Sequence, residues 1–72
     1  MLAQTALATD NRPPPVPKGA IKTFGPYGPK YEVGAVQRQL ANGDWLVRVQ
    51  LIETGETFDY RFSDLLVDPE AI

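Results

Sequence analysis

Hydrophobic and polar residues alternate along three runs between residues 31 and 62, and these runs are rich in β-branched and aromatic residues. Such alternation is typical of strands with one buried face. Two turn signals, Asn42-Gly43 and Thr54-Gly55, separate the runs. Asn-Gly favours a two-residue type I′ turn, whose backbone matches the twist of paired strands. The pattern therefore predicts an antiparallel meander joined by two tight hairpins.

Two-residue turns fix the register, because residues directly opposite each other share one face of the sheet. In the second hairpin this register gives one consistent apolar row and sets Arg48 opposite Arg61. The pairs of the row are Val47 with Phe62, Val49 with Tyr60 and Leu51 with Phe58. We predict that this row forms the core.

The first hairpin places Trp45 and Arg38 on the same apolar face, with Arg38 opposite Val47. A charged guanidinium group on an apolar face needs an explanation. Either a bulge near Gly34-Ala35 shifts the strand, or Arg38 lies at the open end of the sheet with its stem beside Trp45. Arg38 is also a candidate for partner contact, whereas Trp45 is interpreted as a core residue in preference to a binding residue.

A second apolar row, Val33, Leu46 and Ile52, falls on the opposite face in these registers. Half-solvated sheets normally alternate more strictly, so this row needs cover. The closing segment, residues 63–72, predicts a short helical turn capped by Ser63 and ended by proline. Either this segment or a partner covers the second row.

Residues 1–18 end in a proline-rich stretch between Arg12 and Lys18. Proline removes amide donors and holds the backbone extended. We expect a disordered Pro-rich tail over residues 1–18, acting as a spacer or as a polyproline ligand, followed by one small β domain over residues 19–72. The first apolar residues are too few to span a membrane and lack a positive flank.

Tyr27 lies between two Gly-Pro steps, Gly25-Pro26 and Gly28-Pro29. These steps predict a rigid, irregular loop, because proline fixes φ and glycine permits unusual conformations. Tyr27 is either an exposed anchor for a partner or a lid over the end of a barrel. The lid is the preferred interpretation.

The chain has 72 residues and contains neither Cys nor His. A chain of this length builds one small core, and the absence of Cys favours the cytoplasm. No His can serve as base for Ser63, no thiol is available as nucleophile, and the usual ligands of zinc are missing. We therefore expect no enzyme, no metal and no cofactor.

Charge is divided unevenly along the chain. Residues 1–30 carry four Lys or Arg against one Asp, whereas residues 31–72 carry three Arg against eight carboxylates. An acidic domain repels the phosphate backbone of nucleic acids. A protein is therefore the preferred partner.

Three stretches, residues 24–33, 53–56 and 65–70, resemble a family of small bacterial proteins of unknown function. The first carries the motif Phe-Gly-Pro-x-Gly-Pro-x-Tyr-Glu-Val, and the last contains Asp-Pro-Glu. The resemblance covers about residues 19–71 and implies no activity. More loosely, the short strands with a terminal helical turn resemble SH3-like barrels, a likeness of fold from which function does not follow.

We expect a mainly β fold: a small antiparallel sheet of about three to five strands, closed into an SH3-like barrel, with a short C-terminal helical turn. The expected function is a non-catalytic protein-binding module, an accessory or antitoxin-like partner of another bacterial protein. Its candidate contact residues are Tyr27, Val33, Arg38, Trp45, Leu46 and Ile52.

The alternative function is a small nucleic-acid-binding regulator with an aromatic and basic sheet face. That face would combine Tyr27, Trp45, Arg38, Arg48 and Arg61. Homo-oligomerisation is left open, and no membrane contact is expected.

Overall fold

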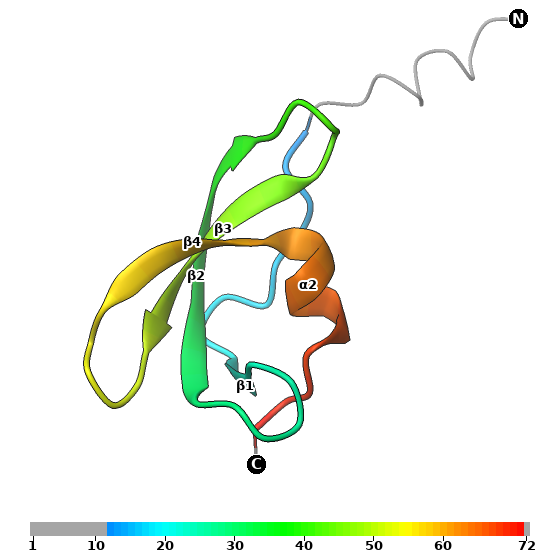
Figure 1. Ribbon diagram of the computed structural model, residues 1–72. Coiled ribbons are helices and arrows are strands. Elements are labelled where there is room, and N and C mark those ends of the chain that lie inside the picture. The colour runs from blue at the N-terminus through cyan, green and yellow to red at the C-terminus, as the bar shows by residue number, and fades with distance from the viewer. Residues whose placement is uncertain (1–11, 72) are drawn as a thin grey trace, which may run out of the picture.

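The computed structural model describes residues 12–71, so the tail prediction for residues 1–11 lies outside the described residues. Four antiparallel strands form one sheet in the order β1-β2-β3-β4, and a short helix, α2, follows the last strand (Figure 1). The elements are β1 (Ile21–Thr23), β2 (Lys30–Gln39), β3 (Trp45–Leu51), β4 (Thr57–Arg61) and α2 (Phe62–Val67). The mainly β class, the antiparallel sheet and the C-terminal helical turn are confirmed. The sheet is open, with β1 and β4 at its edges, and closure into a barrel is not seen in residues 12–71.

The β2–β3 hairpin has a three-residue loop, residues 41–43, in place of the predicted two-residue turn. The amide of Leu40 donates to the carbonyl of Asp44 at 2.7 Å and closes this loop. Gly43 has a φ of 93°, whereas Asn42 has a negative φ. A type I turn followed by a left-handed glycine has this geometry. Asn42-Gly43 therefore marks the hairpin correctly, but the predicted loop length is wrong.

The β3–β4 hairpin has a longer loop than predicted, residues 52–55. The amide of Leu51 donates to the carbonyl of Glu56 at 2.8 Å on the far side of that loop. The observed pairs include Val47 with Tyr60, Arg48 with Asp59 and Val49 with Phe58. This register differs from the predicted one by two residues. Because side chains alternate with a period of two, the predicted faces are right and the predicted partners are wrong.

A bulge lies at Gly34-Ala35, as the first of the two explanations for Arg38 predicts. The register of β2 against β3 shifts between Val33 and Val36. Val33 consequently lies opposite Val49 and is buried, with 2% of its surface exposed. The prediction that Val33 belongs to a second apolar row is therefore wrong.

A second register shift, between Val36 and Arg38, decides where Arg38 lies. Arg38 is opposite Leu46, which alternates along β3 with the buried Val47. Arg38 is therefore on the polar face of the sheet, and the predicted pair of Arg38 with Val47 is wrong. The guanidinium of Arg38 therefore does not have to fit into the core.

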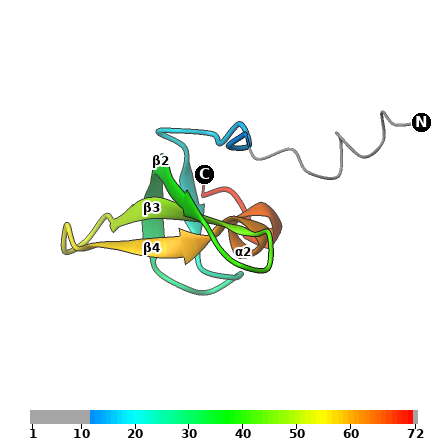
Figure 2. The ribbon, with the colours of Figure 1, turned by 90° about the horizontal axis from the view of Figure 1, so that it is seen from above.

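The core lies between α2 and the sheet face that α2 covers (Figures 1 and 2). Its buried side chains are Tyr31, Val33, Val47, Val49 and Leu65. Leu65 is the contribution of α2 and is fully buried. The closing segment therefore covers the core face and not the opposite face, because only the core face presents a continuous apolar surface.

Both ends of the described chain are held by contacts with the rest of the domain. The segment after α2 runs beside β1, where the amide of Thr23 donates to the carbonyl of Pro69 at 3.0 Å. At the other end, Val16 is half-buried against the core cluster. The contacts of the β domain thus reach back into the segment expected to belong to the tail.

The helix begins at Phe62, with Arg61 as its N-cap residue, so the prediction of Ser63 as the cap is wrong. The Ser63 hydroxyl instead donates to Oδ2 of Asp44 at 2.6 Å. This hydrogen bond ties α2 to the β2–β3 loop and lowers the pKa of Asp44. Within residues 12–71, no helix has the length and apolar character needed to cross a membrane.

Candidate functional site

The Gly-Pro loop, residues 24–29, connects β1 to β2 and is held from within. The amide of Phe24 donates to the carbonyl of Pro29 at 3.2 Å and closes the loop. The hydroxyl of Thr23 donates to the carbonyl of Gly25 at 2.6 Å. Gly25 has a φ of 69°, a conformation that residues with a side chain rarely adopt. The sequence therefore fixes this loop locally, as the two Gly-Pro steps predict.

The carboxylate of Asp68 fixes the same loop from outside. Its Oδ1 accepts the amide hydrogen of Gly25 at 3.0 Å. Its Oδ2 accepts hydrogen bonds from the hydroxyls of Tyr31 and Tyr60, both at 2.8 Å. One side chain at the end of α2 thus joins the Gly-Pro loop, β2 and β4. We call this group of four residues the Asp68 node.

Both tyrosines of the node are held in their protonated form. Burial, followed by the hydrogen bond to Asp68, raises the pKa of Tyr31 well above its usual range and that of Tyr60 to about 12. Each hydroxyl therefore stays a donor at neutral pH. Phe24 packs against both rings, with centroids 4.3 Å from Tyr31 and 5.0 Å from Tyr60. The node therefore positions a loop, with both tyrosine hydroxyls as hydrogen-bond donors.

The loop holds Tyr27 in solvent, with 97% of its surface exposed. A lid would be buried against the end of the sheet, so the preferred interpretation of Tyr27 is wrong and its ring is an exposed one. Single exposed apolar residues are ordinary on protein surfaces. An exposed aromatic ring is less ordinary on a loop that is held both by its own hydrogen bonds and by the carboxylate of Asp68.

A hollow of about 400 Å³ lies beside the Gly-Pro loop. Its walls are Gly28, Pro29, Lys30, Ile52 and Glu53. Ile52 is 49% exposed, and its amide donates to the carbonyl of Lys30 at 3.1 Å. Of the sequence candidates, Tyr27 therefore belongs to the Gly-Pro loop and Ile52 borders it.

The other sequence candidates lie elsewhere. Arg38 and Leu46 are opposite each other on the polar face, near the β2–β3 loop. Trp45 lies opposite Gln39 at the start of β3 and is half-buried. Val33 is buried in the core. The structure therefore does not assemble the six candidates into one surface.

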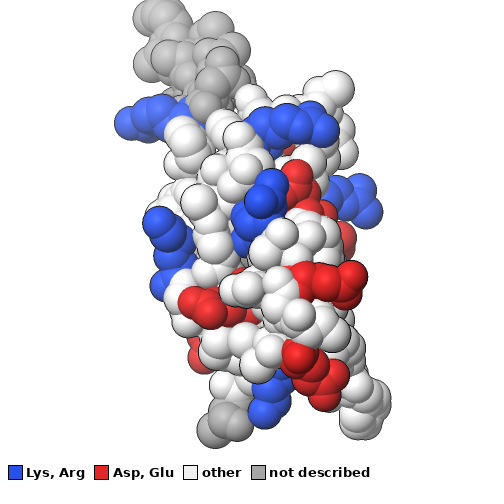
Figure 3. Space-filling model, turned by 90° about the vertical axis from the view of Figure 1, so that its left-hand side faces the viewer, with Lys and Arg blue, Asp and Glu red and all other residues white. Residues whose placement is uncertain are grey.

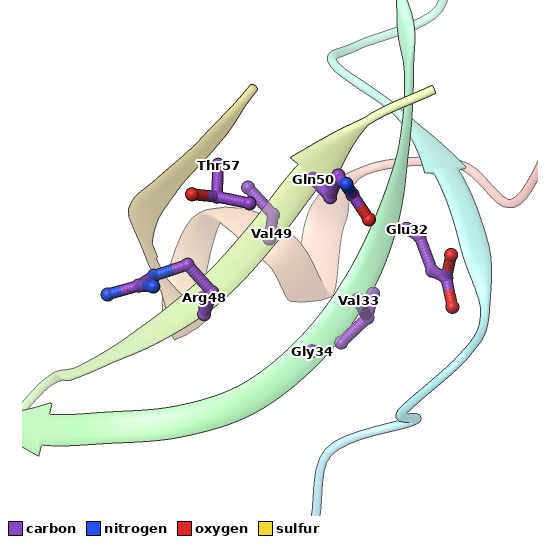
Figure 4. A pocket seen from close by; sticks show the side chains of 7 residues that line it. All are labelled: Glu32, Val33, Gly34, Arg48, Val49, Gln50 and Thr57. Atoms are coloured by element: carbon purple, nitrogen blue, oxygen red, sulfur yellow. The ribbon is translucent and has the colours of Figure 1, made fainter. Parts of the chain in front are cut away.

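A smaller hollow, of about 150 Å³, lies on the polar face (Figure 4). Its walls are Glu32, Val33, Gly34, Arg48, Val49, Gln50 and Thr57. Figure 4 shows the Glu32 side chain on the β1 side of this hollow and Arg48 on the β4 side. Within residues 12–71, no group of three or more Asp or Glu side chains is arranged to hold a metal ion.

The Asp68 node is not among the sites predicted from the sequence. Tyr60 belongs to the predicted apolar row, and neither Tyr31 nor Asp68 is among the candidate contact residues. The available signal was the first and the last of the three stretches that carry the family resemblance, residues 24–33 and 65–70. The structure brings these two stretches together through the bond from Gly25 to Asp68.

The fold and this node define a small mainly β protein, built of an open four-stranded sheet and one helical turn, with a fixed and exposed Gly-Pro loop. The sequence profile of a family of unknown function (DUF5397) matches residues 9–72, and the chain belongs to that family. It is 50% identical over 56 residues to an uncharacterized protein of Haemophilus influenzae. The matched part covers 78% of this chain and 89% of that relative.

Proposed function

We propose that this protein is a non-catalytic protein-binding module whose contact site is the Gly-Pro loop around Tyr27. The observation that carries the proposal is the 97% exposure of Tyr27 on a loop fixed by the Asp68 node. Tyrosine is enriched among the residues that dominate binding energies. A loop that is already fixed loses little conformational entropy on binding, so its contacts translate more fully into affinity.

The neighbouring hollow supports a protein as the partner. Ile52 and Pro29 give it an apolar wall, and Lys30 and Glu53 give it charges of both signs at the rim. An apolar centre with a polar rim is the usual arrangement of a protein interface. We place the module in the cytoplasm, as an accessory or antitoxin-like partner of another bacterial protein.

The test begins with the full chain immobilised and exposed to an extract of its source organism, followed by mass spectrometry of the retained proteins. A retained candidate is then purified and titrated against the chain and against Tyr27→Ala. We expect Tyr27→Ala to weaken binding by about 2 kcal/mol or more, roughly thirtyfold in Kd. The control is Val67→Ala, because Val67 is 79% exposed on α2 and lies outside the loop. Equal Kd values for Tyr27→Ala and the unchanged chain would overturn the proposal.

The alternative, a nucleic-acid-binding regulator, loses part of its support through the observed register. Arg48 is opposite Asp59 and forms an ion pair with it at 2.8 Å. Arg61 approaches Asp64 at 3.5 Å. Two of the three arginines thus have carboxylates beside them, which weakens their attraction for phosphate. A fluorescence titration with single-stranded and duplex DNA and RNA at low salt tests this alternative directly.

A further inference from the structure

The polar face of the sheet is charged differently at its two ends. At the β2–β3 end, Arg38 and Arg61 lie on either side of Leu46, since both are paired with it in register. At the other end, Glu32 lies on β2 and two further glutamates, Glu53 and Glu56, lie on or next to the β3–β4 loop. All five of these side chains belong to exposed residues, and one cation, Lys30, lies at the acidic end.

The surface view shows the same division. Figure 3 looks at the side of the molecule that is on the left in Figure 1, away from α2. Lys and Arg gather mostly in the upper half of this view, and Asp and Glu mostly in the lower half. The centre is neutral, because Arg48 and Asp59 pair with each other there.

The charges at the two ends lack strong partners within the described chain. The side chain of Arg38 forms no hydrogen bond or ion pair with any of residues 12–71. The contact of Arg61 with Asp64 is long, at 3.5 Å, and leaves the arginine side chain 55% exposed. In the same part of the chain, Glu32 and Glu53 have no ion pair.

We propose that the polar face binds a second copy of this chain, with the two sheets antiparallel. A face that is positive at one end and negative at the other becomes complementary to itself after a rotation of 180° about its centre. In this arrangement Arg38 and Arg61 of each copy meet the glutamates at the β3–β4 end of the other. The two-fold symmetry repeats every such contact, so each charge pair occurs twice in the dimer.

Charge complementarity is the observation that selects a second copy as the occupant. The face carries little exposed apolar surface, with Leu46 half-buried and Ile52 at one end. Its association is therefore electrostatic in origin and weakens with salt. The proposal is argued from the charges of the sheet face and does not rest on the binding role of Tyr27, although Glu53 belongs both to this face and to the hollow beside the Gly-Pro loop.

The test is analytical ultracentrifugation of the full chain over a range of concentrations, at about 0.01 M and about 1 M salt, where the Debye length is about 30 Å and about 3 Å. We expect a concentration-dependent dimer at low salt and a monomer at high salt. A monomer under both conditions, or a dimer whose dissociation constant is the same in both, overturns the proposal.

Two charge reversals separate this arrangement from a simple effect of net charge. Arg38→Glu and Lys30→Glu change the net charge equally, but Lys30 lies at the acidic end of the face, in register with Thr23. We expect Arg38→Glu to weaken association roughly tenfold and Lys30→Glu to strengthen it. Association that weakens equally in both variants overturns the proposal.

The double variant Arg38→Glu with Glu53→Arg reverses both ends of the face, and we expect it to associate more tightly than Arg38→Glu alone. Lys30, Arg38 and Glu53 are all exposed, and circular dichroism checks that each variant is folded. A double variant as weak as the single one contradicts the antiparallel arrangement.

Discussion

The hydroxyl of Tyr31 donates a hydrogen bond of 2.8 Å to Oδ2 of Asp68, although 37 residues separate the two along the chain. Tyr31 is fully buried in β2, and Asp68 is the C-cap residue of α2. Because a buried hydroxyl without a partner is costly, this bond links the position of the closing segment to the integrity of the core. The same carboxylate holds Gly25, so the stability of the core and the shape of the Gly-Pro loop depend on one side chain.

Removal of the Asp68 carboxylate is therefore expected to destabilise the protein. Asp68→Ala leaves the hydroxyls of Tyr31 and Tyr60 without their acceptor, at about 1–3 kcal/mol for a buried group. We expect a loss of about 2 kcal/mol or more in the free energy of unfolding by urea. Asp68→Asn recovers only part of it, because an amide cannot offer an acceptor to both tyrosines and to the amide of Gly25 at once.

Asp64→Ala is the matched control, because Asp64 is in α2 and its ion pair with Arg61 is exposed. An exposed ion pair contributes about 0–1 kcal/mol. If Asp68→Ala and Asp64→Ala unfold at the same urea concentration, the Asp68 node contributes nothing to stability.

The raised pKa values of the two node tyrosines predict a loss of stability in alkali. Burial and the hydrogen bond to Asp68 raise the pKa of Tyr60 to about 12, against 10.0 for an unperturbed tyrosine. The folded state then binds the phenolic proton more tightly than the unfolded state does. The resulting stability is complete below about pH 10 and is lost as the pH rises toward 12.

Urea unfolding between pH 8 and pH 12 measures this dependence, with those limits set on either side of the tyrosine pKa of about 10. Tyr60→Phe removes one of the two titrating hydroxyls, so its stability should fall less steeply over the same interval. The variant Tyr27→Phe serves as control, because Tyr27 is 97% exposed and outside the node. A slope unchanged by Tyr60→Phe would contradict the assignment.

The faces of the strands could be predicted from the sequence, whereas the loop lengths could not. A period of two along β3 and β4 assigns Val47, Val49 and Tyr60 to the core whether the register is the predicted one or one shifted by two. The loop length depends on the φ of a few residues. Asn42-Gly43 supports both the two-residue and the three-residue turn, because the second needs a positive φ at the glycine alone.

The Asp68 node could not be predicted because its partners are distant in sequence. Gly25 and Tyr31 lie in β1–β2 and its connecting loop, and neither differs in sequence pattern from an ordinary turn or strand residue. Local sequence indicates that the Gly-Pro loop is rigid, but it does not indicate the bond from Gly25 to Asp68 that holds the loop from outside.

The only fully buried side chain of α2 is expected to carry most of the stability that the helix provides. Leu65→Ala removes apolar atoms from the core and leaves a cavity, which costs about 2–5 kcal/mol. The neighbouring Leu66 is 60% exposed, so Leu66→Ala is expected to change the free energy of unfolding by less than about 1 kcal/mol. Thermal or urea unfolding of both variants measures the difference. Comparable losses in the two would mean that α2 does not dock through Leu65.

Substitutions at Gly34, in the bulge, and at Gly43 separate the effect of close packing from the effect of backbone conformation. A Cβ at Gly34 would lie 2.8 Å from the carbonyl oxygen of Arg48, and a backbone atom cannot yield as a side chain does. Gly34→Ala is therefore expected to force β2 and β3 apart, at a cost of about 1–3 kcal/mol. Gly43 provides the contrast, because a Cβ there meets nothing within 4 Å and its φ of +93° alone opposes a side chain.

Asparagine at the two positions distinguishes these causes. Gly43→Asn should be milder than Gly43→Ala, because asparagine adopts a left-handed conformation more readily than alanine does. Gly34→Asn should be at least as damaging as Gly34→Ala, because the obstacle there is space. The measurements are urea unfolding and the cross-strand nuclear Overhauser effects between Val33 and Val49, which lie opposite each other beside the bulge. If Gly34→Ala keeps both its stability and these contacts, the close approach of β2 to Arg48 is not what fixes the register.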